Sequence, residues 1–414
     1  MKYLLKFTLV CFASLLIPCL AFAGKYYVDS KNGNDSNAGI RMDVPWKSLD
    51  KVNTGGFKPG DVISFRRGSE WSGELVISTS GEKGRPITFT AYGEGKEPVI
   101  SNPGDPTGVS IRINGDWIIV EHFFVRDAHL AGIFISQGAD HNIIRNNEAT
   151  HTGMGVSIHG RYNLVTHNYA HDLIMVRNTQ GGDDDYGAVG IWMFSSNNEV
   201  SYNRMLNCKA PSYDYGHDGG VVEFYGNVDS CYVHHNTGEN CNGSFEVGGR
   251  RDTLTHNLIA YNIYINNGVA GGFHVGGTFG VYFEDMRIEN NVFYDTAYSD
   301  YAIGLWNGKP ESVDIKYRNN ILFVPNVSHI SNYPVFDHQN NLYYLGGKSD
   351  PDYQLGSGEK IADPEFVDAA HHDFHLKKGS PAIDAGTDLG FGSDFDDRPV
   401  PAGKAPDLGV FEYR

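Results

Sequence analysis

The stretch Tyr232-Val233-His234-His235-Asn236 recurs in altered form through the middle of the chain and decides the fold. Each copy is a short β-prone run that ends in asparagine, and the other copies end at Asn147, Asn168, Asn203, Asn262, Asn291, Asn320 and Asn341. Successive asparagines lie 21 to 35 residues apart, which suits one turn of a β-solenoid with loops of varying length. Asparagine tolerates left-handed backbone and forms side-chain ladders, so we assign these residues to turns and not to catalysis.

A second recurring element places two apolar residues on either side of a variable one. The copies are Ile111-Arg112-Ile113, Ile133-Phe134-Ile135, Val156-Ser157-Ile158, Val222-Glu223-Phe224, Phe245-Glu246-Val247 and Phe273-His274-Val275. Because alternate side chains of a strand point to opposite faces, the middle residues are predicted to form one outward column. Either Trp192 or Gly190 fills the missing position of this column.

The predicted fold is therefore all-β, a right-handed parallel β-helix with an N-terminal cap and an irregular C-terminal closing segment. We expect the cap and first coils in residues 24–105, the central coils in 106–345 and the closing segment in 346–414. Trp46, Leu49 and Val52 lie at helical spacing and predict a short capping helix. The Pro/Gly/Asp-rich residues 362–384 should cover the last coil, since exposed solenoid ends invite edge pairing.

Residues 1–23 have the pattern of a signal peptide, with two lysines before an apolar run that ends in Ala21-Phe22-Ala23. We expect a secreted protein, periplasmic or extracellular, that begins near Gly24, has no membrane span and is monomeric. The formal charge of -17, from 50 acidic and 33 basic residues, repels nucleic acids and anionic membranes. Lys209 is the only lysine between Thr150 and Asp300, which favours a neutral glycan over a polyanionic one.

Glu223 and Glu246 are the best candidates for catalysis. They occupy matching strings 23 residues apart, one coil, and adjacent strands lie about 4.8 Å apart. Retaining glycosidases use two carboxyl groups about 5 to 5.5 Å apart, one as nucleophile and one as acid/base. Two such close carboxylates also raise one pKa, which keeps a general acid protonated. The alternatives are that both side chains are simply solvated or that they bind a cation.

Further candidates surround this pair in the sequence. Asp218 and His217 precede Glu223 in the same coil as further catalytic candidates, and Asp218 is an alternative partner to either glutamate. His274 is expected at the next outward position of the column after Glu246, where it orients a carboxylate, binds a sugar hydroxyl or is a neutral surface histidine. The candidates for substrate binding are Trp192, Tyr213, Tyr215, Asp214, Arg250 and Arg251. No cofactor is required by this scheme.

The loop Asp183-Asp184-Asp185 is a candidate metal site, because calcium prefers oxygen ligands from carboxylates. Three successive aspartates in a loop are also a common solvated feature.

Three cysteines remain after the predicted signal peptide. Cys208 and Cys241 each follow a repeat asparagine by five residues, so they should stack in successive coils, either as a disulfide or as two thiols lying side by side. Cys231 is expected to be a buried free thiol.

The chain resembles the secreted right-handed β-helix proteins, a group that includes polysaccharide lyases, alginate epimerases and several glycosidase families. The resemblance rests on the repeats and on the segments Tyr26-Tyr27-Val28, Asn34-Asp35-Ser36-Asn37-Ala38-Gly39, Pro59-Gly60-Asp61-Val62-Ile63, Ser380-Pro381-Ala382-Ile383-Asp384-Ala385-Gly386 and Pro406-Asp407-Leu408-Gly409. It implies the fold and a carbohydrate polymer as substrate, while the reaction stays open because this scaffold hosts several chemistries.

Three functions follow as hypotheses. The first is a glycoside hydrolase that uses Glu223 and Glu246. The second is a polysaccharide lyase or C5-epimerase acting on a uronate polymer, with His217, His274, Arg250, Arg251 and a calcium ion as the reacting and neutralising groups. The third is a noncatalytic glycan-binding surface protein.

Overall fold

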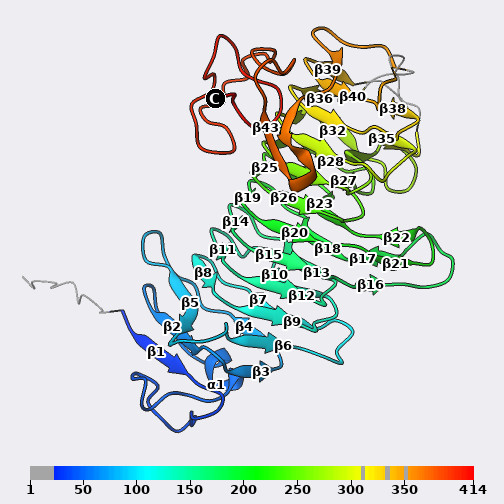
Figure 1. The fold of residues 1–414 in the computed structure, drawn as a ribbon. Helices are drawn as coiled ribbons and strands as arrows, with labels where there is room; N and C mark the ends of the chain where they lie inside the picture. The colour runs from blue at the N-terminus through cyan, green and yellow to red at the C-terminus, as the bar shows by residue number, and fades with distance from the viewer. Residues whose placement is uncertain (1–22, 309–312, 332–335, 349–352) are drawn as a thin grey trace, which may run out of the picture.

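The protein is described by a computed structural model that covers residues 23–308, 313–331, 336–348 and 353–414. The predicted signal peptide lies outside the described residues except for Ala23. In the described part of the chain, no helix is long and apolar enough to cross a membrane. Three long sheets of parallel strands carry the fold, and each coil of the chain contributes one strand to each sheet in turn (Figure 1). The predicted all-β parallel helix is confirmed.

The first sheet consists of β1 (Lys25–Val28), β2 (Val62–Arg66), β5 (Ile87–Tyr92), β8 (Ile118–Glu121), β11 (Ile143–Arg145), β14 (Leu164–Thr166), β19 (Glu199–Ser201), β25 (Tyr232–His234), β29 (Leu258–Ala260), β33 (Met286–Glu289), β36 (Ile315–Arg318) and β39 (Asp337–Gln339). The second consists of β3 (Glu70–Ser72), β6 (Val99–Ser101), β9 (Phe124–Arg126), β12 (Glu148–Thr150), β15 (Tyr169–His171), β20 (Arg204–Leu206), β26 (Thr237–Glu239), β30 (Ile263–Ile265), β34 (Val292–Tyr294), β37 (Ile321–Phe323), β40 (Leu342–Tyr344) and β41 (Lys360–Ile361).

The third sheet carries the candidate site. It consists of β4 (Leu75–Ile77), β7 (Val109–Ile113), β10 (Ala131–Ile135), β13 (Met154–Ile158), β18 (Val189–Met193), β23 (Gly220–Tyr225), β27 (Phe245–Gly248), β31 (Gly271–His274), β35 (Tyr301–Trp306) and β38 (His329–Ser331). Shorter strands lie in the loops: β16 (Met175–Arg177) with β17 (Tyr186–Gly187), β21 (Ala210–Ser212) with β22 (Gly216–Asp218), the trio β24 (Val228–Asp229), β28 (Thr253–Thr255) and β32 (Tyr282–Glu284), and β42 (Phe366–Asp368) with β43 (Asp373–Leu376).

The repeat asparagines form one continuous buried ladder at the corner between the first and second sheets. The Asn168 side-chain amide donates to Asn203 Oδ1 at 3.0 Å, and the same bond joins Asn203 to Asn236. Equivalent bonds continue through Asn262, Asn291, Asn320 and Asn341. The ladder asparagine is not the left-handed residue, because positive φ falls one position earlier, for example on Tyr202 at 54°. The side-chain ladder, and not backbone tolerance, explains these asparagines.

The three cysteines within the described residues, Cys208, Cys231 and Cys241, are buried free thiols. Cys231 takes a position in a second ladder of this kind, where the Asn198 backbone N–H points at its sulfur at 3.4 Å and its own N–H donates to Asn257 Oδ1. Burial raises the pKa of the Cys231 thiol to about 12. The expected stacking of Cys208 and Cys241 is present without a disulfide, and burial followed by the neighbouring Cys241 raises the pKa of Cys208.

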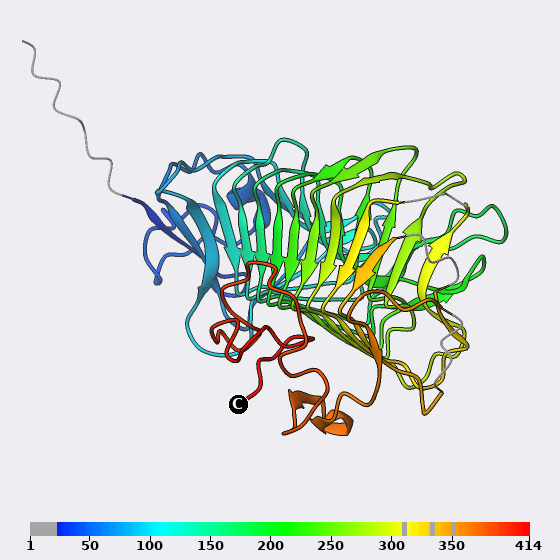
Figure 2. The ribbon, with the colours of Figure 1, turned by 90° about the horizontal axis from the view of Figure 1, so that it is seen from above.

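Both ends of the chain cover part of the stack. The capping helix α1 (Leu49–Asn53) begins after Ser48, whose hydroxyl accepts the Lys51 N–H, and it buries Leu49 and Val52 against the first coils. The C-terminal segment differs from the expectation, because it runs back along the flank and does not cover only the last coil (Figure 2). The Asp394 carbonyl lies 3.2 Å from His235 Nε2, several coils away, and Phe395 stacks on the same ring. Apolar rings on the outer flank therefore need this segment as their cover.

Candidate active site

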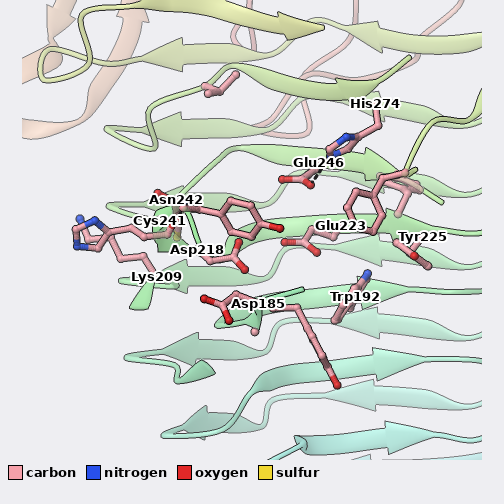
Figure 3. A pocket seen from close by; sticks show the side chains of 18 of the residues that line it. Asp185, Trp192, Lys209, Asp218, Glu223, Tyr225, Cys241, Asn242, Glu246 and His274 are labelled. Atoms are coloured by element: carbon pink, nitrogen blue, oxygen red, sulfur yellow. Dashed lines mark hydrogen bonds and ion pairs between the residues drawn. The ribbon is translucent and has the colours of Figure 1, made fainter. Parts of the chain in front are cut away.

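Glu223 and Glu246 lie on the outer face of the third sheet, in directly paired positions of β23 and β27. Their neighbours Val222, Phe224 and Val247 are buried in the core, so the alternation predicted for these strings is confirmed. The missing position of the column is Trp192, which pairs with Glu223 from β18. Neighbouring parallel strands place such paired side chains about 5 Å apart. Both carboxyl groups point into the same space, together with Asp218 from β22 (Figure 3).

The three carboxyl groups change each other's protonation. Burial, followed by the charges of Glu246 and Asp218, raises the pKa of Glu223 well above its ordinary value. Burial, followed by the charge of Glu246, raises the pKa of Asp218 to about 7 even though its Oδ1 accepts the Gly219 N–H at 2.7 Å. At neutral pH the site therefore holds at least one proton that a carboxylic acid can donate.

His274 is not in the predicted position of the column. Glu246 pairs with Gly272, and His274 lies two residues further along β31. Its ring leans back so that Nε2 lies 2.9 Å from Glu246 Oε1. The Asn307 side-chain amide lies 3.3 Å from His274 Nδ1, and the Trp306 ring packs against the imidazole at 5.1 Å. Because the amide nitrogen of Asn307 can only donate, Nδ1 is the acceptor of that bond, and Nε2 carries the proton donated to Glu246.

Two glycines, Gly248 and Gly272, leave the space that the His274 and Trp306 rings occupy. A Cβ atom on Gly248 would lie 3.2 Å from His274 Cδ2, so the missing side chain lets the ring reach Glu246. A Cβ atom on Gly272 would lie 2.2 Å from the Trp306 ring, which fills the column next to Glu246. The two glycines therefore explain why a histidine from outside the column reaches the carboxylate.

The carboxyl groups lie in an open groove of about 1600 Å³. Most of the predicted site residues line it, namely Glu223, Glu246, Asp218, His217, His274, Trp192, Tyr215, Arg250 and Asp183 to Asp185. Tyr213, Asp214 and Arg251 do not belong to the lining. Tyr213 is 63% exposed at the tip of the β21–β22 hairpin. Arg251 lies in the turn between β27 and β28, where its φ is 64°.

Trp192 and Tyr215, two of the aromatic residues predicted to bind substrate, differ in their exposure. Trp192 is only 8% exposed, because the rings of Tyr186, Phe194 and Tyr225 pack around it. Tyr215 is 47% exposed, and its hydroxyl donates to Asp183 Oδ1 at 2.8 Å. Only Tyr215 therefore presents an accessible ring at the rim of the groove among these two.

The acidic loop is held by contacts within the protein. Asp184, Asp185 and Asp214 bring one ligand oxygen each within 4.8 Å of one another, so Asp214 replaces the predicted Asp183 in this cluster. Arg177 forms an ion pair with Asp184. Asp185 accepts the Thr179 N–H, the Ser212 hydroxyl and the Asp214 N–H. These donors hold the carboxylates of the loop together, and the candidate metal site stays a prediction, now with Asp184, Asp185 and Asp214 as its ligands.

Sequence reasoning missed several groups in the groove. Asn307, Phe279, Tyr298 and Tyr301 come from the coils after Glu246, and Phe134, His159 and Phe194 come from those before Glu223. The available signal was the second outward position of each strand, two residues after the column, which His159, Phe194, Tyr225, His274 and Trp306 share.

Comparisons with known proteins agree with this fold. No family model matches the chain. A segment of 85 residues is 42% identical to lacto-N-biosidase of Bifidobacterium longum subsp. longum, and it covers 19% of this chain and 5% of that protein. The chain thus spans about 5% of the length of this curated relative.

Solved structures match over much more of the chain. Pectate lyase Pel9A superposes with a TM-score of 0.63 at 17% identity, over 94% of this chain and 96% of that one. XylC in complex with xylose gives 0.61 at 11% identity, over 94% and 99%. GH136 lacto-N-biosidase from Eubacterium ramulus gives 0.51 at 15% identity, over 78% and 68%. At these identities the likeness concerns the backbone, and the chain is a parallel β-helix of the kind found in carbohydrate-active proteins.

Proposed function

We propose that this protein is a glycoside hydrolase whose catalytic residues are Glu223 and Glu246. The observation that carries the proposal is their direct pairing on adjacent strands, with the pKa of Glu223 raised, inside a groove open along the flank. Adjacent parallel strands give a carboxyl separation of about 5 Å, which is the separation used for hydrolysis with retention of configuration.

The two carboxyl groups then divide the work. The raised pKa of Glu223 lets it hold a proton, so it is the general acid that protonates the oxygen of the leaving sugar. Glu246 attacks the anomeric carbon and forms a glycosyl ester as the glycosidic bond breaks. Water then hydrolyses the ester, Glu223 takes the proton of that water, and Glu246 is released as a carboxylate.

His274 and Asp218 act through these two residues. The Nε2 hydrogen bond of His274 fixes one oxygen of Glu246 and leaves the other for the anomeric carbon. The negative charge of Asp218 helps to raise the pKa of Glu223 and so keeps the acid protonated. Both are positioning residues.

A neutral glycan is the substrate class that we propose. Three carboxyl groups at the centre of the groove repel a uronate polymer. The cations of the lining are Arg177, which pairs with Asp184, Lys209, which donates to Asn240, and Arg250. The name of the curated relative makes lacto-N-biosides the first compounds to try. We also propose secretion, on the strength of the predicted signal peptide in residues 1–23.

The test is incubation of the mature protein with neutral glycans, including lacto-N-biosides and xylans, and with uronate polymers. Released reducing ends and the absorbance of unsaturated sugars are followed in parallel. New reducing ends without unsaturation are expected. Unsaturated products would identify a polysaccharide lyase, and inverted C5 centres would identify an epimerase. Glycans that bind but stay unchanged would identify a noncatalytic binding protein. Each of these results would reject the hydrolase.

A further inference from the structure

Five aromatic side chains form a continuous surface on the side of the groove away from His274. This aromatic wall consists of Phe134, His159, Trp192, Phe194 and Tyr225, and all five line the groove. They project from the outer face of β10, β13, β18 and β23, or from the residue just after those strands. Figure 3 shows Trp192 and Tyr225 next to Glu223, so the wall begins where the carboxyl groups end.

The rings of the wall hold each other in place. Phe134 stacks on His159 at 4.5 Å, and His159 stacks on Phe194 at 4.3 Å with an angle of 8° between the rings. Trp192 and Tyr225 close the row, with Phe194 at 4.9 and 5.9 Å from them. Four of the five side chains remain partly exposed, which leaves an apolar surface on a strongly acidic protein. Apolar surface of this kind on a soluble protein marks a binding site.

The wall also lacks free charge. Burial, with Arg112 nearby, lowers the pKa of His159 to about 4, so its ring is neutral under ordinary conditions. The Arg112 guanidinium lies 4.8 Å from the Phe134 ring centre and is bound to Glu74. A charged ligand would lose its hydration against this surface without gaining an unpaired partner of opposite charge.

One polar atom of the wall has an unmet hydrogen bond. Trp192 Nε1 is buried and has no partner among the described residues. A buried donor without an acceptor is rare in folded proteins. Leaving its hydrogen bond unmade costs more free energy than leaving one unmade at the surface. Because Trp192 pairs with Glu223, this donor sits one strand from the proposed acid.

We infer that the aromatic wall is a binding subsite for an uncharged sugar residue. The apolar face of this sugar packs on Phe194 and Tyr225, and one of its oxygens accepts the Trp192 N–H. The inference rests on the proposed function and adds the position of a subsite beside Glu223. It excludes uronate residues from that subsite, because the cation beside the wall, Arg112, is already paired with Glu74 and leaves no free positive charge for a carboxylate.

The test uses Glu246→Gln as a host that binds without turnover. Lacto-N-tetraose, xylohexaose and hexagalacturonate are titrated into it by calorimetry. At least one neutral probe should bind more tightly than hexagalacturonate. Adding Phe194→Leu should weaken that binding about tenfold, and Trp192→Phe, which keeps a ring but removes the donor, should weaken it about two- to tenfold.

The matched control is Tyr282→Leu, which removes an aromatic ring that is 66% exposed and outside the groove lining. It should leave binding unchanged. Thermal unfolding checks each variant, and Trp192→Phe carries the test if Phe194→Leu unfolds. Binding of no neutral probe, tighter binding of hexagalacturonate, or wall variants that bind like the host would each overturn the inference.

The outcomes separate the two proposals. Wall-dependent binding without hydrolysis by the unmutated protein would keep the subsite and reject the hydrolase. Hydrolysis that the wall variants leave unchanged would keep the hydrolase and reject the subsite.

Discussion

Replacing Asp218 by asparagine tests the electrostatics of the site through stability. Burial, followed by the charge of Glu246, raises the pKa of Asp218 to about 7 from an ordinary 3.8. A carboxyl group whose pKa is raised on folding contributes full stability below its unfolded value, and that contribution is lost as the pH rises through the folded value. Asparagine keeps the acceptor for the Gly219 N–H and carries no charge at any pH.

The magnitude follows from the pKa difference. A rise from 3.8 to about 7 is about 3 units, and at about 1.4 kcal/mol per unit the upper limit is about 4 kcal/mol. Because three carboxyl groups share the protons and Asp218 is partly exposed, we expect about 2 to 3 kcal/mol. Asp218→Asn should therefore be more stable than the unmutated protein at pH 8 and equal to it near pH 4. For a chain of this size the gain corresponds to about 2 to 4 °C in Tm.

The assay is thermal unfolding by circular dichroism at pH 4, 6 and 8. The control is Asp363→Asn, an exposed aspartate that also accepts one backbone N–H, from Glu365. It should show no gain at pH 8. Activity supplies a second readout, since removing one charge that raises the pKa of Glu223 should move the alkaline limit of activity to lower pH. A gain that is absent at pH 8, or equal at pH 4 and pH 8, would refute the reasoning.

Two further substitutions and one thiol titration test other features of the fold and the site. Gly248→Ala should push His274 from Glu246 by a few tenths of an ångström and lower kcat about three- to tenfold with KM unchanged. The control Gly56→Ala, where a Cβ meets nothing within 4 Å, should have no effect. Equal kcat values for the two variants would contradict the role of His274. Asn236→Ala loses side-chain bonds to Val200, His234 and Asn262 and should destabilise the fold by about 2 to 4 kcal/mol, while the exposed Asn326→Ala should cost much less, and similar losses would contradict the ladder. Thiol titration of the mature, denatured, unreduced protein should find three free thiols, and one would indicate a Cys208–Cys241 bridge.

The fold and the pairing of Glu223 with Glu246 could be predicted from the sequence. Both depend on short-range rules: side chains alternate along a strand, and each coil repeats the same corner. These rules place Glu223 and Glu246 on adjacent outward positions, as the paired strands have them. The Asn ladder follows from the same repeat. Hydrogen bonds between the asparagine side chains explain it, because the left-handed backbone belongs to the preceding residue.

The remaining site depends on features that a periodic pattern does not contain. His274 breaks the column because Gly248 and Gly272 leave space for rings that cross between coils. Asn307 reaches His274 from the residue after β35, 33 positions along the chain. The path of the C-terminal segment along the flank is likewise set by contacts with distant coils, as between Asp394 and His235.

The central claim is that Glu223 and Glu246 carry out the reaction, and turnover by Glu223→Gln and Glu246→Gln tests it most directly. On a glycan that the unmutated protein hydrolyses, each variant should lose at least about a hundredfold in kcat while its circular dichroism spectrum and Tm show an intact fold. Near-normal turnover by either variant would contradict the claim.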